Sequence, residues 1–68
     1  MNEKAIFLSR TAAHLAAIEH GRKAGVDDEI IAKRSAAFPV IRRGEMKGFE
    51  AWFPISATGP RQPVMEAG

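Results

Sequence analysis

The absence of cysteine from a chain of 68 residues is the feature that most limits what this sequence can fold into. A chain of this length forms one domain at most and can bury only a small core. Small natural folds compensate with disulfides, a bound metal or oligomerisation, and disulfides are excluded here. His14 and His20 are six residues apart and lie on different faces of a helix, which does not suit a metal pair. We therefore expect no metal, no cofactor and a homodimer.

The chain is only weakly basic, with ten Lys and Arg against eight Asp and Glu and a net charge of +2. A dedicated nucleic-acid binder of this size usually carries a denser stripe of basic residues. The apolar run at residues 5–9 is too short for a signal peptide or a membrane-spanning helix. The lack of cysteine also suits a reducing compartment. These features predict a cytoplasmic protein that does not associate with membranes.

Two segments, at about residues 10–24 and 27–38, are predicted to be helices. Asp27 suits the N-cap of the second helix, and Pro39 is expected to stop it. The first helix has apolar residues at helical spacing, which predicts a buried face made of Leu8, Ala12, Leu15 and Ile18.

A second pattern on the first predicted helix is a row of small residues spaced four apart. Small side chains allow a partner helix to approach closely. We interpret this row as a candidate dimer face, made of Ala13, Ala17 and Gly21. The alternative is an alanine-rich helix that is favoured by propensity alone.

Residues 40–55 are predicted to form a β-hairpin with a five-residue loop at 44–48. Pairing Arg43 with Phe49 would place Val40 opposite Trp52 and Arg42 opposite Glu50. Side-chain alternation then gives a core face of Ile41, Phe49, Ala51 and Phe53, and an outer face of Val40, Arg42, Glu50 and Trp52. A slip of one residue would exchange the two faces.

The last segment, residues 57–68, has two prolines, two glycines and no periodicity, which predicts a flexible tail. Residues 1–56 are then the single small domain. The expected fold class is α+β and mainly helical, with two helices followed by a β-hairpin.

No motif in the sequence supports catalysis. The chain has no Cys or Tyr, and it has no Gly-x-Ser-x-Gly motif, phosphate loop or dinucleotide fingerprint. The three adjacent acids at 27–29 are explained by capping and by the dipole of the helix that they begin. A chain this short also has difficulty enclosing a pocket of several hundred cubic ångströms. We expect a protein that is not an enzyme.

DNA binding is one interpretation of the cations. Residues 21–34 resemble a helix-turn-helix, and the Phe-Pro junction and the hairpin after it resemble the wing of small phage excisionases. In such proteins the second helix enters the major groove and the wing contacts phosphate. The acids that open the second helix would repel phosphate, so this function is the alternative. Its DNA-contacting residues would be Lys33, Arg34, Arg42, Arg43 and Lys47.

Protein binding is the leading interpretation. The predicted outer face of the hairpin places Trp52 outside, beside Val40 and near Met46, as is typical of interfaces. Trp and Arg are also the residue types most often found as binding anchors. The candidate partner-binding residues are therefore Val40, Arg42, Met46 and Trp52. The alternative is that Trp52, the only tryptophan, belongs to the core.

Two segments, SRTAAHLAAIEHGRKAG and GFEAWFP, resemble the small early accessory proteins of transposable temperate phages. One group among these is the quorum-sensing anti-activators, small dimeric proteins that bind a host transcriptional regulator and can also affect a pilus assembly ATPase. Anti-CRISPR proteins are another group of similar size. The resemblance implies a phage inhibitor that covers a functional surface of a host regulatory protein. It transfers no binding residue to this sequence.

Overall fold

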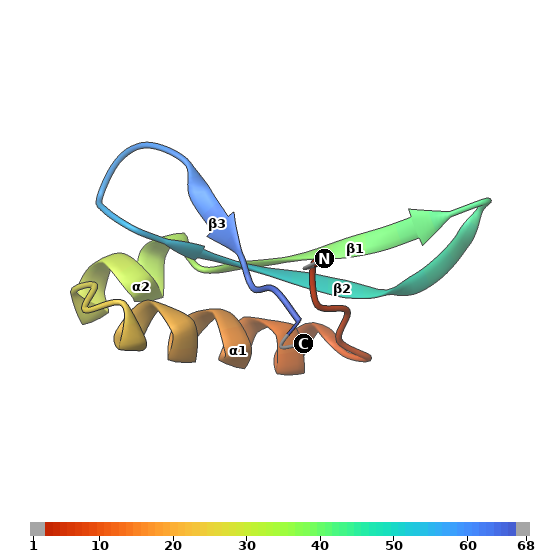
Figure 1. Ribbon diagram of the computed structural model, residues 1–68, viewed down its shortest axis with the longest axis horizontal. Helices are drawn as coiled ribbons and strands as arrows, with labels where there is room; N and C mark the ends of the chain where they lie inside the picture. The colour runs from red at the N-terminus through yellow and green to blue at the C-terminus, as the bar shows by residue number, and fades with distance from the viewer. Residues whose placement is uncertain (1–2, 67–68) are drawn as a thin grey trace.

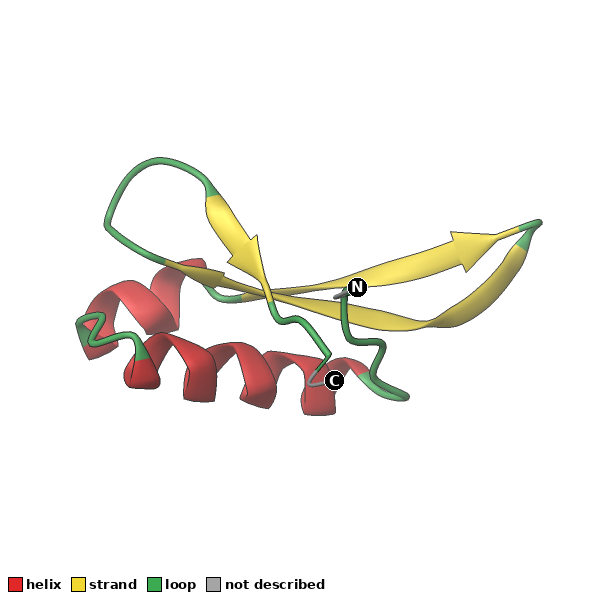
Figure 2. Cartoon of the chain, in the orientation of Figure 1, coloured by secondary structure: helices red, strands yellow, loops and turns green. Residues whose placement is uncertain are grey.

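The computed structural model describes residues 3–66, and both of its helices lie on one side of a three-stranded antiparallel sheet (Figures 1 and 2). The helices are α1 (Arg10–Lys23) and α2 (Asp28–Arg34). The strands are β1 (Ala36–Arg42), β2 (Glu45–Pro54) and β3 (Arg61–Pro63), in the order β1-β2-β3. The helices contain 14 and 7 residues and the strands 7, 10 and 3. The expectation of a mainly helical fold is therefore wrong, because this small α+β domain has helix and strand in nearly equal amounts.

Both helices begin at a capping side chain. The Ser9 hydroxyl accepts a hydrogen bond of 3.1 Å from the Ala12 N–H at the start of α1. At the start of α2, the Asp27 carboxylate accepts a longer one of 3.3 Å from the Glu29 N–H. These contacts satisfy N–H groups that have no partner within the helix, and they fix where each helix begins.

The second helix ends at Arg34, earlier than the predicted residue 38, because the residues after it join the sheet as β1. Pro39 lies inside this strand and does not stop a helix. The Pro39 position faces Phe49, whose N–H and C=O both bond to Phe7 on the opposite side of β2. No ladder hydrogen bond therefore requires an N–H at residue 39, and an edge strand tolerates proline there.

A two-residue turn, Arg43-Gly44, closes the β1–β2 hairpin in place of the expected five-residue loop. The φ angles of these residues are 54° and 78°, and positive values at both positions are what a type I′ turn requires. As a result Arg42 faces Glu45 and Ile41 faces Met46, and a shift of register between Val40 and Ile41 then brings Val40 opposite Gly48. The predicted pairings of Val40 with Trp52 and of Arg42 with Glu50 are therefore wrong.

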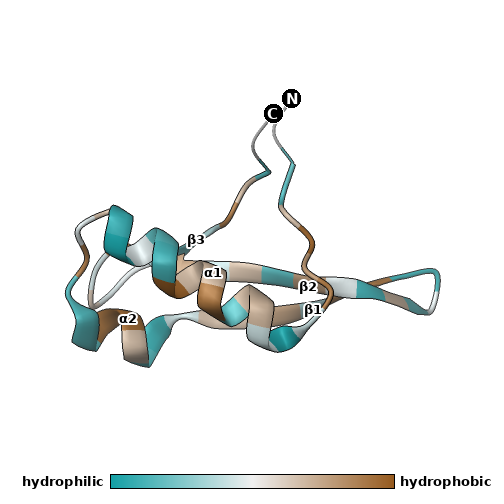
Figure 3. Cartoon of the chain, turned by 90° about the horizontal axis from the view of Figure 1, so that it is seen from below, coloured by the Kyte–Doolittle hydropathy of each residue, from teal (hydrophilic) through white to brown (hydrophobic). Residues whose placement is uncertain are grey.

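The core lies between α1 and β2, and the row of small residues makes the contact. Ala13 and Ala17 of α1 and Ala51 of β2 are all 0 % exposed. The predicted buried face of this helix is wrong, since Leu8 and Leu15 are 93 % and 59 % exposed. Viewed from the α1 side, Figure 3 shows hydrophobic colour on the surface of this helix. The small side chains, and not the leucines, face the sheet because they let the backbone of α1 lie close to it.

The segment expected to be a flexible tail contributes to the domain. Its residues 61–63 form β3, which pairs with the end of β2, and Val64 is only 4 % exposed. The Val64 N–H donates a 2.8 Å hydrogen bond to the Ala51 carbonyl oxygen. The boundary expected at residue 56 therefore does not separate the domain from residues 61–64, which pack with it.

The N-terminal segment pairs with the same edge of β2. Phe7 and Phe49 exchange two backbone hydrogen bonds of 2.8 Å, and a bridge joins Lys4 to Met65. The two ends of the described chain therefore leave the domain side by side (Figure 3). Where the N-terminal segment runs alongside β2, Gly48 has a φ of 148°, and a Cβ added to Gly48 would lie 2.5 Å from the Phe7 carbonyl oxygen.

Candidate functional site

The face of the sheet that points away from α1 carries Trp52. Phe49 and Phe53 pack with the residues between α1 and β2, so alternation along β2 turns Glu50 and Trp52 to the opposite face. Trp52 is half-buried there, and its indole N–H donates a 3.2 Å hydrogen bond to the Glu50 carboxylate. The prediction of which β2 side chains face outward is correct although the predicted register is wrong. Residues 36–40 pair with β2 at partners an even number of positions from the predicted ones, and an even shift leaves every side chain on the same face of the sheet.

Two cations lie over the aromatic rings of this outer face. The Lys4 ammonium is 5.2 Å from the centroid of the Trp52 ring, and the Arg61 guanidinium is 5.6 Å from that of Phe38. At exposed sites such contacts contribute about 0.5 to 1 kcal/mol each. Phe38 is 44 % exposed. A hollow of about 390 Å³ lies here, lined by Phe38, Glu50, Trp52, Pro60 and Arg61.

A second hollow, of about 600 Å³, lies between the N-terminal segment and the hairpin and shares Glu50 with the first. We call the two hollows together the outer groove. The apolar side chains that line the second hollow are Ile6, Val40 and Met65. Its charged side chains are Glu3, Lys4, Arg42, Lys47, Glu50 and Glu66. The outer groove therefore combines an apolar surface with charges of both signs.

Three of the four predicted partner-binding residues line the outer groove, namely Val40, Arg42 and Trp52. Met46 does not line it. It faces Ile41 across the hairpin arm, which is formed by residues 41–47 and projects beyond the N-terminal end of α1 (Figure 1). Both Ile41 and Met46 are 61 % exposed, so the arm presents a separate apolar pair.

The predicted dimer face is occupied within the chain. Ala13 and Ala17 pack against the sheet, and a Cβ at Gly21 would lie 2.9 Å from Cγ1 of Ile31 in α2. A second copy could reach these residues only by separating α1 from the rest of the domain. The homodimer stays a prediction, and Ala13, Ala17 and Gly21 do not provide its interface.

Three of the five predicted DNA-contacting residues make side-chain contacts within the domain, and two of these three lie outside the hairpin. Arg34 donates hydrogen bonds of 2.7 Å to the carbonyl oxygens of Ser56 and Gly59, so it holds the loop before β3. Lys33 pairs with Glu29 at 3.0 Å along α2. Neither cation lies on the hairpin.

The other three cations gather on the hairpin arm. Lys47 pairs with Glu45 at 2.9 Å. Arg42 and Arg43 are exposed, and within residues 3–66 neither forms a hydrogen bond or ion pair through its side chain. The arm therefore offers two free guanidinium groups next to each other in sequence.

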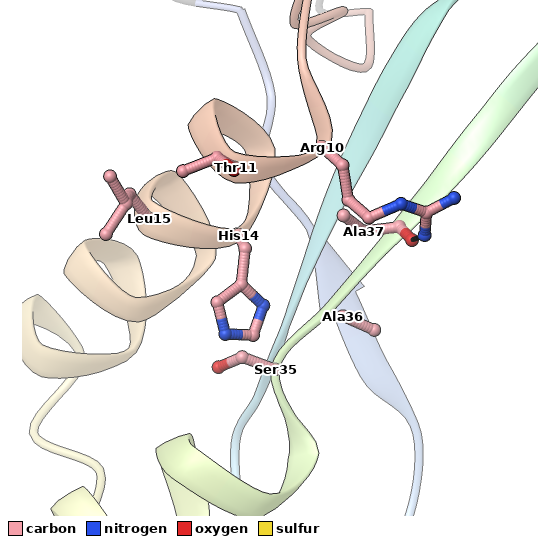
Figure 4. A pocket seen from close by; sticks show the side chains of 7 residues that line it. All are labelled: Arg10, Thr11, His14, Leu15, Ser35, Ala36 and Ala37. Carbon is pink, nitrogen blue, oxygen red and sulfur yellow. Dashed lines mark hydrogen bonds between the residues drawn. The ribbon is translucent and has the colours of Figure 1, made fainter.

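Sequence reasoning missed a third hollow, which we call the junction cleft. It has a volume of about 490 Å³ and lies where α1 meets the start of β1 (Figure 4). Its lining residues are Arg10, Thr11, His14, Leu15, Ser35, Ala36 and Ala37. The two sides of the cleft are far apart in the sequence, so no local pattern could have indicated it.

Two further features concern the described part of the chain only. Within it, no three His, Asp or Glu side chains gather in a way that could hold a metal ion. Neither of its helices is long and apolar enough to cross a lipid bilayer.

Comparisons of the chain with known protein families, with curated proteins and with solved structures gave no match.

Proposed function

We propose that this chain is a small protein-binding module that inhibits a regulatory protein by covering one of its functional surfaces with the outer groove. The observation that carries this proposal is that neither helix of the described chain packs on the outer face of the sheet, where Phe38 and Trp52 border one hollow. Aromatic residues and arginine surrounded by a polar rim are the usual anchors of protein interfaces.

The charges around the outer groove support a protein as the partner. Its lining residues include the cations Lys4, Arg42, Lys47 and Arg61 and the anions Glu3, Glu50 and Glu66. A nucleic acid would require one sign of charge, whereas a protein surface can place complementary charges opposite both. Mixed charges of this kind favour specificity for one partner and suppress association with others.

The class of target is inferred from the resemblance of SRTAAHLAAIEHGRKAG and GFEAWFP to the phage anti-activators. The proposed target is a host quorum-sensing transcriptional activator, and a pilus assembly ATPase is the second candidate target. The proposed action takes place in the bacterial cytoplasm, needs no cofactor and involves no catalysis. The module acts by occlusion, as a homodimer.

Replacing Trp52 with alanine is expected to weaken target binding by at least about 30-fold, the effect of removing a central aromatic anchor. A tagged chain is first used to recover and identify a regulatory protein from host lysate. The affinity of the purified pair is then measured by calorimetry for the wild type and for Trp52→Ala.

Leu15→Ala is the control, because Leu15 is an exposed apolar residue that lies on α1, on the other side of the sheet. Phe38→Ala provides a second probe of the outer groove if Trp52→Ala lowers the stability of the domain. Unchanged affinity in both groove variants, or an equal loss in Leu15→Ala, would contradict the proposal.

The hairpin arm supports a second candidate function, DNA binding by a wing. The observation that favours it is the exposed pair formed by Arg42 at the end of β1 and Arg43 in the turn, with Lys47 on the other strand. Asp28 and Glu29 at the start of α2 oppose contact between that helix and phosphate. DNA binding would therefore depend on the arm alone.

If the arm binds DNA, the logarithm of the affinity for duplex DNA should fall linearly with the logarithm of the salt concentration. A slope of about −2 to −3 is expected if the three cations of the arm each neutralise one phosphate. Fluorescence anisotropy measures the slope, and the double variant Arg42→Gln, Arg43→Gln should lose most of it. Absence of binding at about 50 mM salt would remove this candidate.

A further inference from the structure

We propose that the free edge of β1 is closed to strand pairing, so that neither a partner protein nor a second copy extends the sheet there, and that Pro39 and Arg10 close it. The strand order β1-β2-β3 leaves β1 at the outside of the sheet. An edge strand presents unpaired N–H and C=O groups to which another chain can bond. Pro39 and Arg10 do not line the outer groove, so this inference does not rest on the function proposed above.

The first observation concerns the backbone of Pro39. This residue lies opposite Phe49, whose N–H and C=O both bond to Phe7 on the other side of β2. Two residues paired in this way do not bond to each other in an antiparallel ladder, so the backbone groups of residue 39 point to the free edge. Any other residue would offer an N–H there, whereas proline has none. The missing donor is therefore at a position where an added strand would need one.

The second observation concerns Ala37, whose backbone also points to the free edge. It lies opposite Ala51, whose C=O accepts a hydrogen bond from Val64 on the other side of β2. Arg10 occupies the Ala37 C=O, to which its Nη1 atom donates a hydrogen bond of 3.3 Å. Figure 4 shows the Arg10 side chain extending from the start of α1 to β1. Its guanidinium lies 5.0 Å from the centroid of the Phe49 ring, and this second contact holds it at the edge.

The remainder of β1 is also unsuited to pairing. The register shifts between Val40 and Ile41, and such an irregularity bends and twists a strand. Arg42 and Arg43 follow, and both are exposed. Proline, bulges and charged side chains are the means by which natural sheets keep their edges unpaired. Within residues 36–40, the Ala37 N–H is then the one outward donor.

The consequence for binding is that a partner has to use a face of the domain and not this edge. A strand added along residues 36–40 would find one N–H donor where a regular strand offers two. It would also have to share the Ala37 C=O with Arg10 or displace the guanidinium. A carbonyl of the added strand left without a donor loses its bond to water and gains none in return, which opposes the pairing.

The double variant Arg10→Ala, Pro39→Thr is designed to open the edge, because it frees the Ala37 C=O and adds an outward N–H. Threonine suits a strand and adds little apolar surface. Two opened edges can pair with each other, so sedimentation velocity between about 10 and 500 µM should show the molar mass rising to about twice that of the wild type. Each single variant should associate about tenfold more weakly than the double variant. The matched control Arg22→Ala, Pro60→Thr removes the same residue types from α1 and from the loop before β3, and it should keep the wild-type mass.

Hydrogen exchange tests the edge in the wild type and locates the association in the variant. In the wild type, the outward Ala37 amide should exchange at least about tenfold faster than the Phe38 amide, which points toward β2. In the associated double variant, the amides of residues 37 and 39 should both become protected, because each would bond to the second copy.

Three results would overturn the proposal. The first is an unchanged mass of the double variant at about 500 µM while its near-UV circular dichroism matches that of the wild type. The second is association that leaves the Ala37 amide unprotected, because the copies would then meet at another surface. The third is equal protection of the Ala37 and Phe38 amides in the wild type, a measurement that needs no variant and applies even if the double variant is unstable.

Discussion

Gly48→Ala is expected to lower the free energy of unfolding by about 2 to 5 kcal/mol, which is the sum of a strained backbone and a steric clash. Gly48 has a φ of 148°, which residues with a side chain rarely adopt. The added Cβ would lie 2.5 Å from the Phe7 carbonyl oxygen and 2.6 Å from the Ile6 side chain. The N-terminal segment would have to leave β2 to make room, and its two hydrogen bonds with Phe49 would then be lost.

Urea unfolding measures the loss of stability, and hydrogen exchange at the Phe7 and Phe49 amides reports where it arises. Gly44→Ala is the matched control, because Gly44 also has a positive φ but a Cβ added there would meet no other atom within 4 Å. The control should cost only the backbone term, about 1 to 2 kcal/mol. Equal losses in the two variants, with the Phe7 and Phe49 amides still protected, would show that the N-terminal segment does not pack closely against Gly48.

Ile31→Ala is the second substitution with a large expected effect, about 2 to 5 kcal/mol of unfolding free energy. Ile31 is 2 % exposed and is the only residue of α2 that is buried. It fills the space beside Gly21, where a Cβ would lie 2.9 Å from its Cγ1 atom. Within residues 3–66 the buried hydrophobic side chains number six, so this core has little else with which to fill the cavity.

Thermal and urea unfolding of Ile31→Ala measure the effect, with Ile41→Ala as the control. Ile41 is 61 % exposed on the hairpin arm, and truncation there should change the stability by no more than about 0.5 kcal/mol. Ile31→Val should fall between the wild type and Ile31→Ala. A loss below about 1 kcal/mol in Ile31→Ala would mean that α2 contributes little to the stability of the domain.

Local rules predicted the parts of the fold that depend on neighbouring residues. Asp27 caps the second helix as expected, because capping involves a side chain and the backbone two or three residues away. The two faces of β2 were also predicted correctly, since alternation needs no knowledge of the partner strand. For this reason the sequence could indicate that Trp52 faces away from Phe49 and Phe53.

The parts that depend on distant residues were predicted wrongly. Size and hydrophobicity favoured Leu15 for the buried side of α1, but the sheet is best approached by Ala13 and Ala17. The hairpin register was missed because Arg43 occupies a turn position with positive φ, which Asn, Asp or Gly usually fills. Pro39 suggested a helix stop, although an edge strand accepts it equally well.

The candidate sites differ in the same way, because one depends on neighbouring residues and the other on distant ones. Val40, Arg42 and Trp52 belong to one strand pair, and sequence reasoning placed them on one face. The junction cleft instead needs Arg10 near Ala37, a contact between positions 27 apart. Only the tertiary structure brings its two sides together, and the residue types involved carry no catalytic or metal-binding pattern.

The bridge between Lys4 and Met65 has a consequence for how the chain folds. It joins positions separated by almost the whole chain, so forming it before the other contacts would close a very long loop at a high entropic cost. The hairpin closed at Arg43-Gly44 needs only a two-residue connection and can form early. Pairing of the two ends is therefore expected to be a late folding event, and the first contact to open when the domain begins to unfold.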